Sequence, residues 1–221
     1  MNPALRETLV TAVTLLAFAV VGSALLAATY ALTRPQILAS EAAERRARIA
    51  ETLPAGSFDN DLVRTARVLA PDPLLGLDRP AHYYLATRQG QATAVVLEAV
   101  APDGYSGDIR LLIGIGRDGR ITGVRVSAHK ETPGLGDYIE AAKSRWIHVF
   151  DGRSLTDPPA SGWKVRKDGG QFDYMTGATV TPRAVVAAVH RALQYFEQHK
   201  DRLLAVPSHV QEQSHDRARN P

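Results

Sequence analysis

One uncharged, apolar run, residues 8–33, constrains the fold of this chain more than any other feature. It exceeds the roughly 20 apolar residues that a helix needs to cross the hydrocarbon core of a bilayer. A cleavable signal peptide is the alternative, because Ala27 and Ala28 supply the small residues of a cleavage site. The run is long for a signal, and a single basic residue, Arg6, precedes it. The sequence therefore predicts a short N-terminal segment, residues 1–7, and a retained transmembrane helix over residues 8–33.

The charges beside this run leave its orientation open. Arg6 lies before it, whereas Arg34, Arg45, Arg46 and Arg48 follow it. Counted alone, these charges would hold the larger part of the chain in the cytoplasm, because cytoplasmic flanks carry an excess of Lys and Arg. Large domains cross membranes largely regardless of charge, however, and the arginines after Arg34 begin well beyond the membrane end. Charge counting therefore does not decide which side the domain occupies.

Residues 34–80 are predicted to form a charged helical stalk followed by an irregular lead-in. Pro35 is expected to interrupt the helix, because proline lacks the backbone N–H and its ring clashes with the preceding turn. Alternating charges over residues 38–53 then indicate a second helical stretch, either a solvated stalk or a docking surface for a partner subunit. Residues 54–80 are rich in Pro, Asp and Gly, which favour irregular structure.

Hydrophobic alternation predicts two β-hairpins after residue 80. Strands over residues 82–88 and 93–100 flank a Gln-Gly-Gln turn. Strands over residues 109–115 and 121–127 flank an Asp-Gly pair, which is a strong turn signal. The alternation along residues 109–115 indicates that one face of the sheet is buried.

The second hairpin turn also matches a dinucleotide-binding pattern. Gly114, Gly116 and Gly119 have the spacing of G-x-G-x-x-G. That pattern requires a helix after the glycines, within a strand-helix-strand unit. Residues 120–126 have strand character instead, so we predict a hairpin and no nicotinamide site here.

The composition limits the chemistry that the chain can perform. Fewer than 200 residues remain outside the apolar run, which is enough for one domain with a core. The chain has no cysteine, which excludes disulfides, thiolate-held metals and cysteine-held iron–sulfur clusters. The histidines show no metal-ligand spacing, so no metal site is predicted. The formal net charge is +3, with basic and acidic residues interspersed, which gives nucleic-acid binding no support.

The run Thr-Gly-Ala-Thr that ends at Thr179 is a candidate attachment site. Gly177 and Ala178 leave little side-chain bulk beside the Thr179 hydroxyl. Thr181 is expected to cap the helix that follows and Pro182 to take its first position, since apolar residues then recur at helical spacing. The N–H groups at a helix start favour a phosphate, so a phosphoester on Thr179 would lie in a favourable field. A loop that merely enters a capped helix explains the same residues.

The segment His-Lys-Glu-Thr-Pro-Gly-Leu-Gly, residues 129–136, is the second candidate for chemistry. Its proline and two glycines favour a loop whose backbone can approach a flat ring closely. Asp137 and Glu140 form a capping pair for a predicted helix through Ile147. The residues alone therefore fit a ligand-binding loop and an ordinary helix entry equally well.

Five short motifs follow the apolar run in a fixed order. They are Gly-Tyr-Ser-Gly at 104–107, Ile-Gly-Ile at 113–115, the 129–136 segment, Lys-Asp-Gly-Gly at 167–170 and the Thr-Gly-Ala-Thr run. Together they resemble the G subunit of the Rnf-type (also called Rsx) ion-translocating electron transport complex over nearly the whole chain. A more distant likeness is to the C subunit of the sodium-pumping NADH:quinone reductase. Both of these families carry covalently linked FMN.

The resemblance implies a fold and a cofactor site. The fold is an α+β FMN-binding domain over residues 81–200, with an antiparallel sheet and packed helices, on one N-terminal transmembrane helix. Residues 201–221 would form a disordered tail. Thr179 would carry FMN as a phosphoester, placed by a flavin transferase that reads Asp173, Thr176, Gly177 and Ala178. Contacts to the flavin are expected from His129, Glu131, Thr132, Leu135 and Gly136.

The resemblance also implies a function and a location. The chain would be the electron-carrying flavoprotein subunit of a bacterial inner-membrane complex that couples electron flow between ferredoxin and NAD to ion movement, with its domain in the periplasm. It would act with other subunits and have no complete catalytic activity alone, because a flavin domain on a single helix has no ion pathway. Thr179 would be an anchor for the cofactor. A membrane-anchored FMN-binding regulatory or sensory module is the main alternative. A structural subunit without cofactor and a hydrolase with Thr179 as nucleophile are weaker alternatives.

Overall fold

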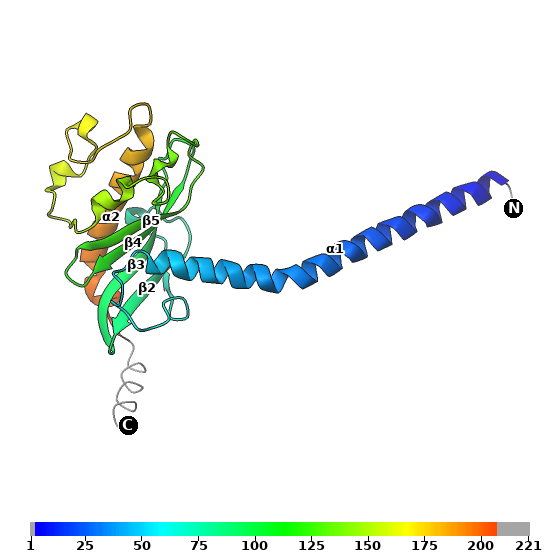
Figure 1. Ribbon diagram of the computed structural model, residues 1–221, viewed down its shortest axis with the longest axis horizontal. Coiled ribbons are helices and arrows are strands. Elements are labelled where there is room, and N and C mark those ends of the chain that lie inside the picture. Colours follow the sequence, from blue (N-terminus) through cyan, green and yellow to red (C-terminus); the bar gives the residue numbers. More distant parts are fainter. Residues whose placement is uncertain (1–2, 207–221) are drawn as a thin grey trace, which may run out of the picture. The chain divides into compact units, whose positions relative to one another are not determined.

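The computed structural model describes residues 3–206, and the chain divides between residues 45 and 46 into two compact units. The first unit is helical, and the second contains a sheet, a long helix and several short 3-10 helices (Figure 1). Most of the predicted tail, residues 207–221, lies outside the described residues. Its first residues, 201–203, belong to the last helix, so the predicted tail starts too early.

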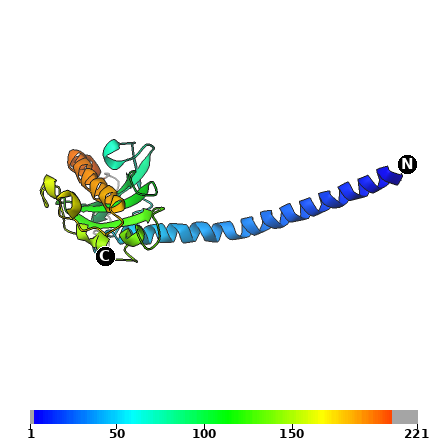
Figure 2. The ribbon, with the colours of Figure 1, turned by 90° about the horizontal axis from the view of Figure 1, so that it is seen from above.

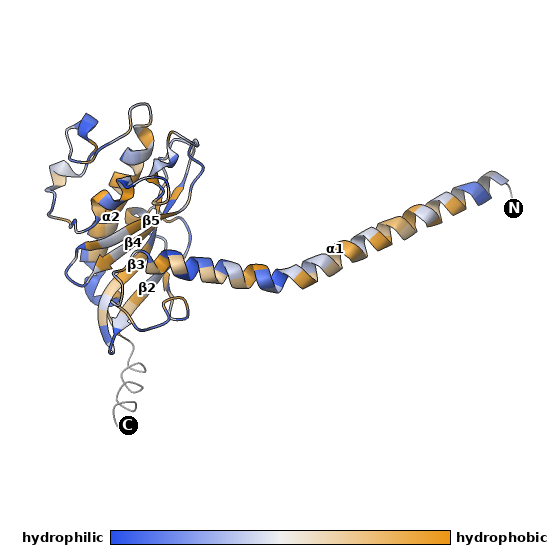
Figure 3. Cartoon of the chain, in the orientation of Figure 1, coloured by the Kyte–Doolittle hydropathy of each residue, from blue (hydrophilic) through white to orange (hydrophobic). Residues whose placement is uncertain are grey.

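The N-terminal helix α1 spans Pro3–Ala50 without a break. The predicted interruption at Pro35 is therefore wrong, and the apolar run and the charged stalk form one helix. Proline removes one backbone hydrogen bond, but the helix-favouring Ala, Leu, Glu and Arg residues on both sides carry the helix through it. Figure 3 shows apolar residues along the first part of α1 and charged residues toward its end.

Among the residues that the structure describes, α1 is the one helix long and apolar enough to cross a membrane. An 18-residue window within its stretch Leu9–Ala50 has a mean hydropathy of 2.4. Threonine hydroxyls inside the apolar part donate to backbone carbonyls one turn earlier: Thr11 to Glu7, Thr14 to Val10, Thr29 to Leu25 and Thr33 to Thr29. A bilayer core offers these hydroxyls no other partner, so the internal pairing suits a membrane helix.

The second unit is built around a five-stranded antiparallel sheet in the order β1-β2-β3-β4-β5. The strands are β1 Arg67–Leu69, β2 Ala81–Arg88, β3 Gln91–Ala101, β4 Ile109–Gly116 and β5 Ile121–Ala128. Both predicted hairpins are present, as is the Asp-Gly turn between β4 and β5. The predicted α+β class with an antiparallel sheet is confirmed. β1 escapes prediction because three residues are too few to show an alternation.

Helix α2, Val180–Leu203, covers one face of this sheet and packs across β3 and β4 (Figure 2). Its apolar residues recur at helical spacing and enter the main core together with the inward side chains of the strands. Contributors from the helix and the two strands include Val185, Val189, Leu193, Phe196, Leu97, Leu111 and Ile113. The long helix thus fixes where its own first turn stands relative to the sheet.

The opposite face of the sheet is buried as well. Residues 46–66 cover it, and Ile49 and Leu53 form a second core with side chains of β2, β3 and β4. The close approach depends on glycine, because a Cβ on Gly114 would lie 2.4 Å from the Thr52 carbonyl oxygen. The prediction of one buried face is therefore incomplete: the end of the stalk and the lead-in bury the other.

Residues 129–179, between β5 and α2, consist of turns and short 3-10 helices. These helices are Asp137–Ile139, Trp146–Phe150, Ala160–Gly162 and Arg166–Asp168. The predicted helix through Ile147 is therefore wrong. Glu140 has an extended backbone that ends the first 3-10 helix, and the Asp137 side chain accepts the N–H of Gly134, which precedes it. Aromatic rings in mutual contact fill the space beneath these turns: Trp146, Phe150, Trp163 and Phe172.

Candidate cofactor-attachment site

Thr179 lies directly after a tight turn and directly before α2. In the turn, the Ala178 N–H donates to the Met175 carbonyl oxygen at 3.0 Å. Gly177 has a φ of +89°, in the left-handed region where other residues are strained. Glycine at this position therefore lets the chain turn back and enter the helix at Thr179.

Thr179 is the N-cap of α2, and Val180 is its first helical residue. The predicted cap at Thr181 and first helical position at Pro182 are therefore wrong, since the helix begins two residues earlier. The Thr179 side chain is half-buried and, within the described part of the chain, makes no capping hydrogen bond. Its hydroxyl oxygen is therefore available for an ester bond.

The start of α2 has the properties of a phosphate site. The helix is 24 residues long, and the N–H groups of its first turn have no acceptor one turn earlier. These donors and the positive end of the helix dipole favour an anion beside the N-cap. The residues present thus fit a phosphate ester on Thr179.

Glu131 is buried beside this helix start, with 4% of its surface exposed. One carboxylate oxygen accepts the Ser106 N–H at 3.0 Å, and the other accepts the Thr181 hydroxyl. Glu131 therefore joins the Gly-Tyr-Ser-Gly turn, its own loop and the first turn of α2. Because both oxygens face the protein, this geometry does not support the predicted contact between Glu131 and a flavin ring.

Asp137, Glu140 and Lys143 form an ionic network next to His129. The His129 ring accepts the Glu131 N–H through Nδ1 at 3.0 Å, and its Nε2 lies 2.8 Å from a Glu140 oxygen. These two partners select the tautomer that carries its hydrogen on Nε2. The Lys143 Nζ lies 2.8 Å from Asp137 Oδ2 and 2.7 Å from Glu140 Oε1.

Lys143 stabilises the charged form of both carboxylates. Its hydrogen bond, reinforced by the Gly134 N–H, lowers the pKa of Asp137. It also lowers the pKa of Glu140, with a further contribution from the hydrogen bond to His129. The same two carboxylates raise the pKa of Lys143. All three groups are therefore charged at neutral pH, and they hold this loop in one shape.

Tyr138 and Trp146 hold the segment that leads into the turn. The Trp146 indole N–H donates to the Asp173 carbonyl oxygen at 2.8 Å, and the Tyr138 hydroxyl accepts the Met175 N–H at 3.3 Å. The two rings pack edge to face with centroids 5.5 Å apart. Burial raises the pKa of Tyr138, so its hydroxyl stays neutral. Two aromatic side chains thus fix the backbone ahead of the Thr-Gly-Ala-Thr run.

The Lys-Asp-Gly-Gly segment packs against the first turn of α2. The Arg183 guanidinium donates to Asp168, with 2.7 Å between Nη2 and Oδ1. This pairing lowers the pKa of Asp168 and raises that of Arg183. A Cβ on Gly170 would lie 2.0 Å from the Lys164 carbonyl oxygen, so the turn needs glycine for its close backbone approach.

The remaining predicted contact residues differ in exposure. Thr132 and Leu135 are exposed at the tip of their loop, where a bound ring could meet them. Gly136 is buried, and a Cβ there would lie 2.8 Å from a Glu131 oxygen. His129 is partly buried between Glu131 and the ionic network. Thr132 and Leu135 are therefore the predicted contact residues most accessible to a ligand.

The predicted recognition residues surround the turn and face solvent. Asp173 is exposed and pairs with Arg166 at 2.9 Å, and Thr176 is exposed at the turn itself. Several residues that shape the site lack a sequence signal of this role, namely Thr181, Tyr138, Trp146 and Arg183. Ser106 is the exception, because its place in the Gly-Tyr-Ser-Gly motif marks the turn that bonds to Glu131.

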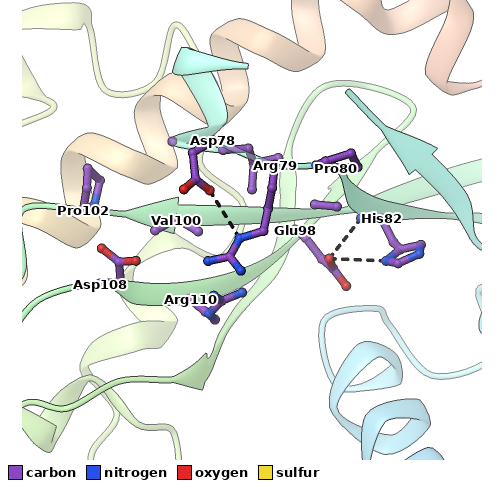
Figure 4. Close-up of a pocket in the computed structure, with 12 residues that line it drawn as sticks. Asp78, Arg79, Pro80, His82, Glu98, Val100, Pro102, Asp108 and Arg110 are labelled. Carbon is purple, nitrogen blue, oxygen red and sulfur yellow. Dashed lines mark hydrogen bonds and ion pairs between the residues drawn. The ribbon is translucent and has the colours of Figure 1, made fainter. Parts of the chain in front are cut away.

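Two pockets lie on the part of the domain that includes the start of β4. One, of about 270 Å³, is lined by Ser106, Gly107, Asp108, Arg110, Ala128, His129 and Lys130. It borders the Glu131 site through Ser106 and His129. The other, of about 240 Å³, contains the ion pair between Arg79 and Asp78 and the contact of His82 with Glu98 (Figure 4).

Two family models match parts of this chain. Residues 104–194 match the FMN-binding domain family, and residues 1–51 match the RnfG N-terminal region. The domain that carries Thr179 is thus an FMN-binding domain.

Similar proteins place the whole chain in one family. The G subunit of the ion-translocating oxidoreductase complex of Pseudomonas aeruginosa (strain UCBPP-PA14) is 53% identical over 200 residues, which cover 90% of this chain and 94% of that protein. Its counterpart from Vibrio cholerae serotype O1 (strain ATCC 39541 / Classical Ogawa 395 / O395) is 48% identical over 191 residues, covering 86% and 91%. The chain belongs to the family of G subunits of ion-translocating oxidoreductase complexes.

One solved structure also aligns with part of the chain. It is the C subunit of the Na(+)-translocating NADH-quinone reductase from Parabacteroides distasonis ATCC 8503, with 22% identity and a TM-score of 0.40. The alignment covers 58% of this chain and 65% of that one. An overlap of this size adds no weight to the sequence matches.

Proposed function

We propose that Thr179 carries FMN through a phosphoester bond and that this chain is the electron-carrying subunit of a membrane-bound ion-translocating oxidoreductase. The main support is the Thr179 hydroxyl at the N-cap of α2, which makes no capping bond among the described residues, inside a domain that matches the FMN-binding family. A flavin transferase would read the exposed turn, whose residues are Asp173, Thr176, Gly177 and Ala178.

Formation of the ester requires an activated flavin donor. Free FMN would have to expel water in aqueous solution, which is unfavourable, so the donor is a dinucleotide such as FAD. The Thr179 oxygen forms a bond to the FMN phosphorus, the pyrophosphate bond to AMP breaks, and AMP leaves. The hydroxyl proton passes to a base on the transferase. The helix start stabilises the negative charge of the resulting phosphodiester.

The residues of this chain then bind and orient the cofactor. Bound FMN supplies transfer of one or two electrons, for which the protein provides position and electrostatic tuning. We propose that His129, Thr132, Leu135 and Gly136 lie beside the ring system. Ion movement, and the passage of electrons between ferredoxin and NAD, would involve the partner subunits of the complex.

Substitution of Thr179 tests the attachment. The full chain is produced with its flavin transferase and separated on a denaturing gel, and the flavin fluorescence of the band is measured. Thr179→Ala removes the hydroxyl and is expected to abolish the fluorescent band, whereas Thr179→Ser restores it in part. Thr176→Ala is the matched control, because it removes a threonine hydroxyl of the same motif and is expected to retain some label. A fluorescent Thr179→Ala band would disprove the attachment.

We also propose that the domain lies on the periplasmic side of a bacterial inner membrane. α1 supplies the anchor, and the large domain after it can be translocated regardless of the arginines near residue 45. A reporter enzyme that is active only outside the cytoplasm, fused after Pro221, is expected to be active. An inactive reporter, together with activity of a cytoplasmic reporter at the same place, would reverse the orientation.

A further inference from the structure

The start of α2 is held in place by a buried carboxylate. Glu131 accepts the Ser106 N–H with one oxygen and the Thr181 hydroxyl with the other. Thr181 lies two residues after Thr179, in the first turn of the helix. The position of the Thr179 oxygen therefore depends on the hydrogen bond between Glu131 and Thr181.

The packing around Glu131 leaves it little freedom. A Cβ on Gly104 would lie 3.0 Å from Oε1, and a Cβ on Gly136 would lie 2.8 Å from Oε2. Among the described residues, Glu131 makes no ion pair, although burying an unpaired carboxylate costs free energy. An apolar side chain would fill the same space at lower cost but could not bond to both partners. Glu131 therefore contributes by fixing the positions of its two hydrogen-bond partners.

We propose that Glu131 is a positioning residue that fixes the first turn of α2 against two loops and so sets the Thr179 hydroxyl for phosphoester formation. The inference rests on the proposed attachment at Thr179. Among the described residues Glu131 makes no hydrogen bond to Thr179, so it acts through Thr181. Misplacement of a reacting oxygen by about 1 Å can slow a reaction by roughly a hundredfold, so a modest shift of this turn is sufficient.

Two single substitutions remove the same link from opposite sides. Glu131→Ala removes both acceptors, and Thr181→Val removes the hydroxyl donor with little change of shape. Because both substitutions break the same link, their effects should not add. The variant that carries both is expected to be labelled with flavin little more slowly than the slower single variant. Glu131→Gln is the conservative rescue: its amide oxygen can accept the Ser106 N–H, and its amide N–H can donate to the Thr181 oxygen.

The chain also offers a matched control carboxylate. Glu98 accepts the Tyr84 hydroxyl at 2.6 Å and the His82 N–H at 3.0 Å, and it joins the neighbouring strands β2 and β3 (Figure 4). Glu98→Ala therefore also removes two hydrogen bonds from one carboxylate. It has no link to the first turn of α2, so its effect on labelling reports loss of stability alone.

The experiment measures flavin transfer from FAD to the full chain by the flavin transferase, together with the unfolding temperature of each variant. We expect kcat to fall about tenfold or more in Glu131→Ala and in Thr181→Val, with KM for the chain nearly unchanged because the exposed motif is intact. The kcat of Glu131→Gln should stay within about threefold of that of the unsubstituted chain. The kcat of Glu98→Ala should equal that of the unsubstituted chain.

The outcomes separate the positioning role from attachment and from stability. The positioning role would be overturned if Thr181→Val and Glu131→Ala were labelled as fast as the unsubstituted chain. It would also be overturned if Glu98→Ala lost as much labelling rate as these two variants. If Glu131→Ala does not fold, Thr181→Val and Glu131→Gln decide the matter by the same criteria. A chain that retains label in Thr179→Ala would instead disprove the attachment, and the positioning role would fall with it.

Discussion

The domain combines two halves that hold their shape in different ways. The strand half, residues 81–128, is a series of hairpins in which neighbours in sequence are neighbours in space. The turn half, residues 129–179, has short 3-10 helices and is held by bonds from side chains to distant backbone, such as that from Trp146 to Asp173. The first half supplies the platform, and the second supplies most of the candidate site. Regular pairing thus stabilises the platform, whereas irregular, individually bonded loops hold most of the candidate site.

A glycine in the strand half gives the largest expected effect on stability. Gly114→Ala places a Cβ 2.4 Å from the Thr52 carbonyl oxygen and from the Thr122 hydroxyl, so the second core must open. We expect the free energy of unfolding to fall by about 3 kcal/mol, because a backbone atom cannot move aside cheaply. Chemical denaturation of the full chain in detergent measures the change. Flavin labelling of the folded protein should be unaltered.

Gly116→Ala is the control on the same strand. Its Cβ would meet the end of the Asp118 side chain, which can rotate away. A loss of about 1 kcal/mol or less is expected. If Gly114→Ala abolished labelling while leaving stability unchanged, the division between the two halves would be wrong.

The sequence predicts the strand half well and the turn half poorly, for a physical reason. The alternation in residues 109–115 and the Asp-Gly turn contain the information for one hairpin within a few residues. The capping signal at Asp137 and Glu140 is equally local, yet neither carboxylate caps a long helix. Asp137 accepts hydrogen bonds from the Gly134 N–H and Lys143 instead, and Glu140 accepts one from Lys143. Local patterns cannot show which distant or competing partner a polar side chain will meet.

The same limit applies within the candidate site. The small residues before Thr179 and the helix after it are visible in the sequence, so a hydroxyl near a helix start is predictable. The exact cap is not, because Thr181 has the same chemistry and its bond to Glu131 spans 50 residues. Glu131 itself is predicted as a ligand contact, since buried and ligand-facing carboxylates share one sequence pattern. The positioning role proposed for it rests on its burial and on its two donors.

A glycine in the turn half is expected to affect function more than stability. Gly177→Ala meets open space, so its cost is the left-handed backbone alone, about 1 kcal/mol. Relief of that strain would move the turn that precedes Thr179, and we expect the rate of flavin labelling to fall about tenfold. The rate is measured with the transferase and FAD, as for the variants of Glu131.

Gly119→Ala provides the matched comparison. Gly119 has a φ of +82° and meets nothing closer than a ring atom of Phe196 at 4.0 Å. It therefore carries a similar strain, but at the hairpin turn of the strand half. It should lower stability by about 1 kcal/mol and leave labelling unchanged. Equal labelling rates in the two variants would remove the functional distinction between the halves.

The smallest expected effect is a change of pH at the Lys143 network. The pKa values of Asp137 and Glu140 are lowered in the folded protein, so their contribution is complete above their ordinary pKa values of 3.8 and 4.5 and is lost as pH falls through the lowered values. The pKa of Lys143 is raised, so its contribution is complete below 10.5 and is lost only above that range. Between about pH 5 and pH 9 the loop should therefore keep constant protection.

Hydrogen exchange of the Gly134 amide, which donates to Asp137 at 2.8 Å, measures the protection of the loop directly. The observed rates are first corrected for the pH dependence of exchange in an unstructured chain. Protection is expected to weaken below about pH 4, whereas amides of β3 and β4 stay protected. Lys143→Met serves as control, because without the ammonium the loss should begin at a higher pH. The change is small since Lys143 and part of Glu140 are exposed to solvent, which screens the pair, although Asp137 is buried. A loss of protection near pH 7 would show that the ionic network does not hold the loop. The turn half would then depend on the packing of its aromatic rings and on its hydrogen bonds to backbone groups.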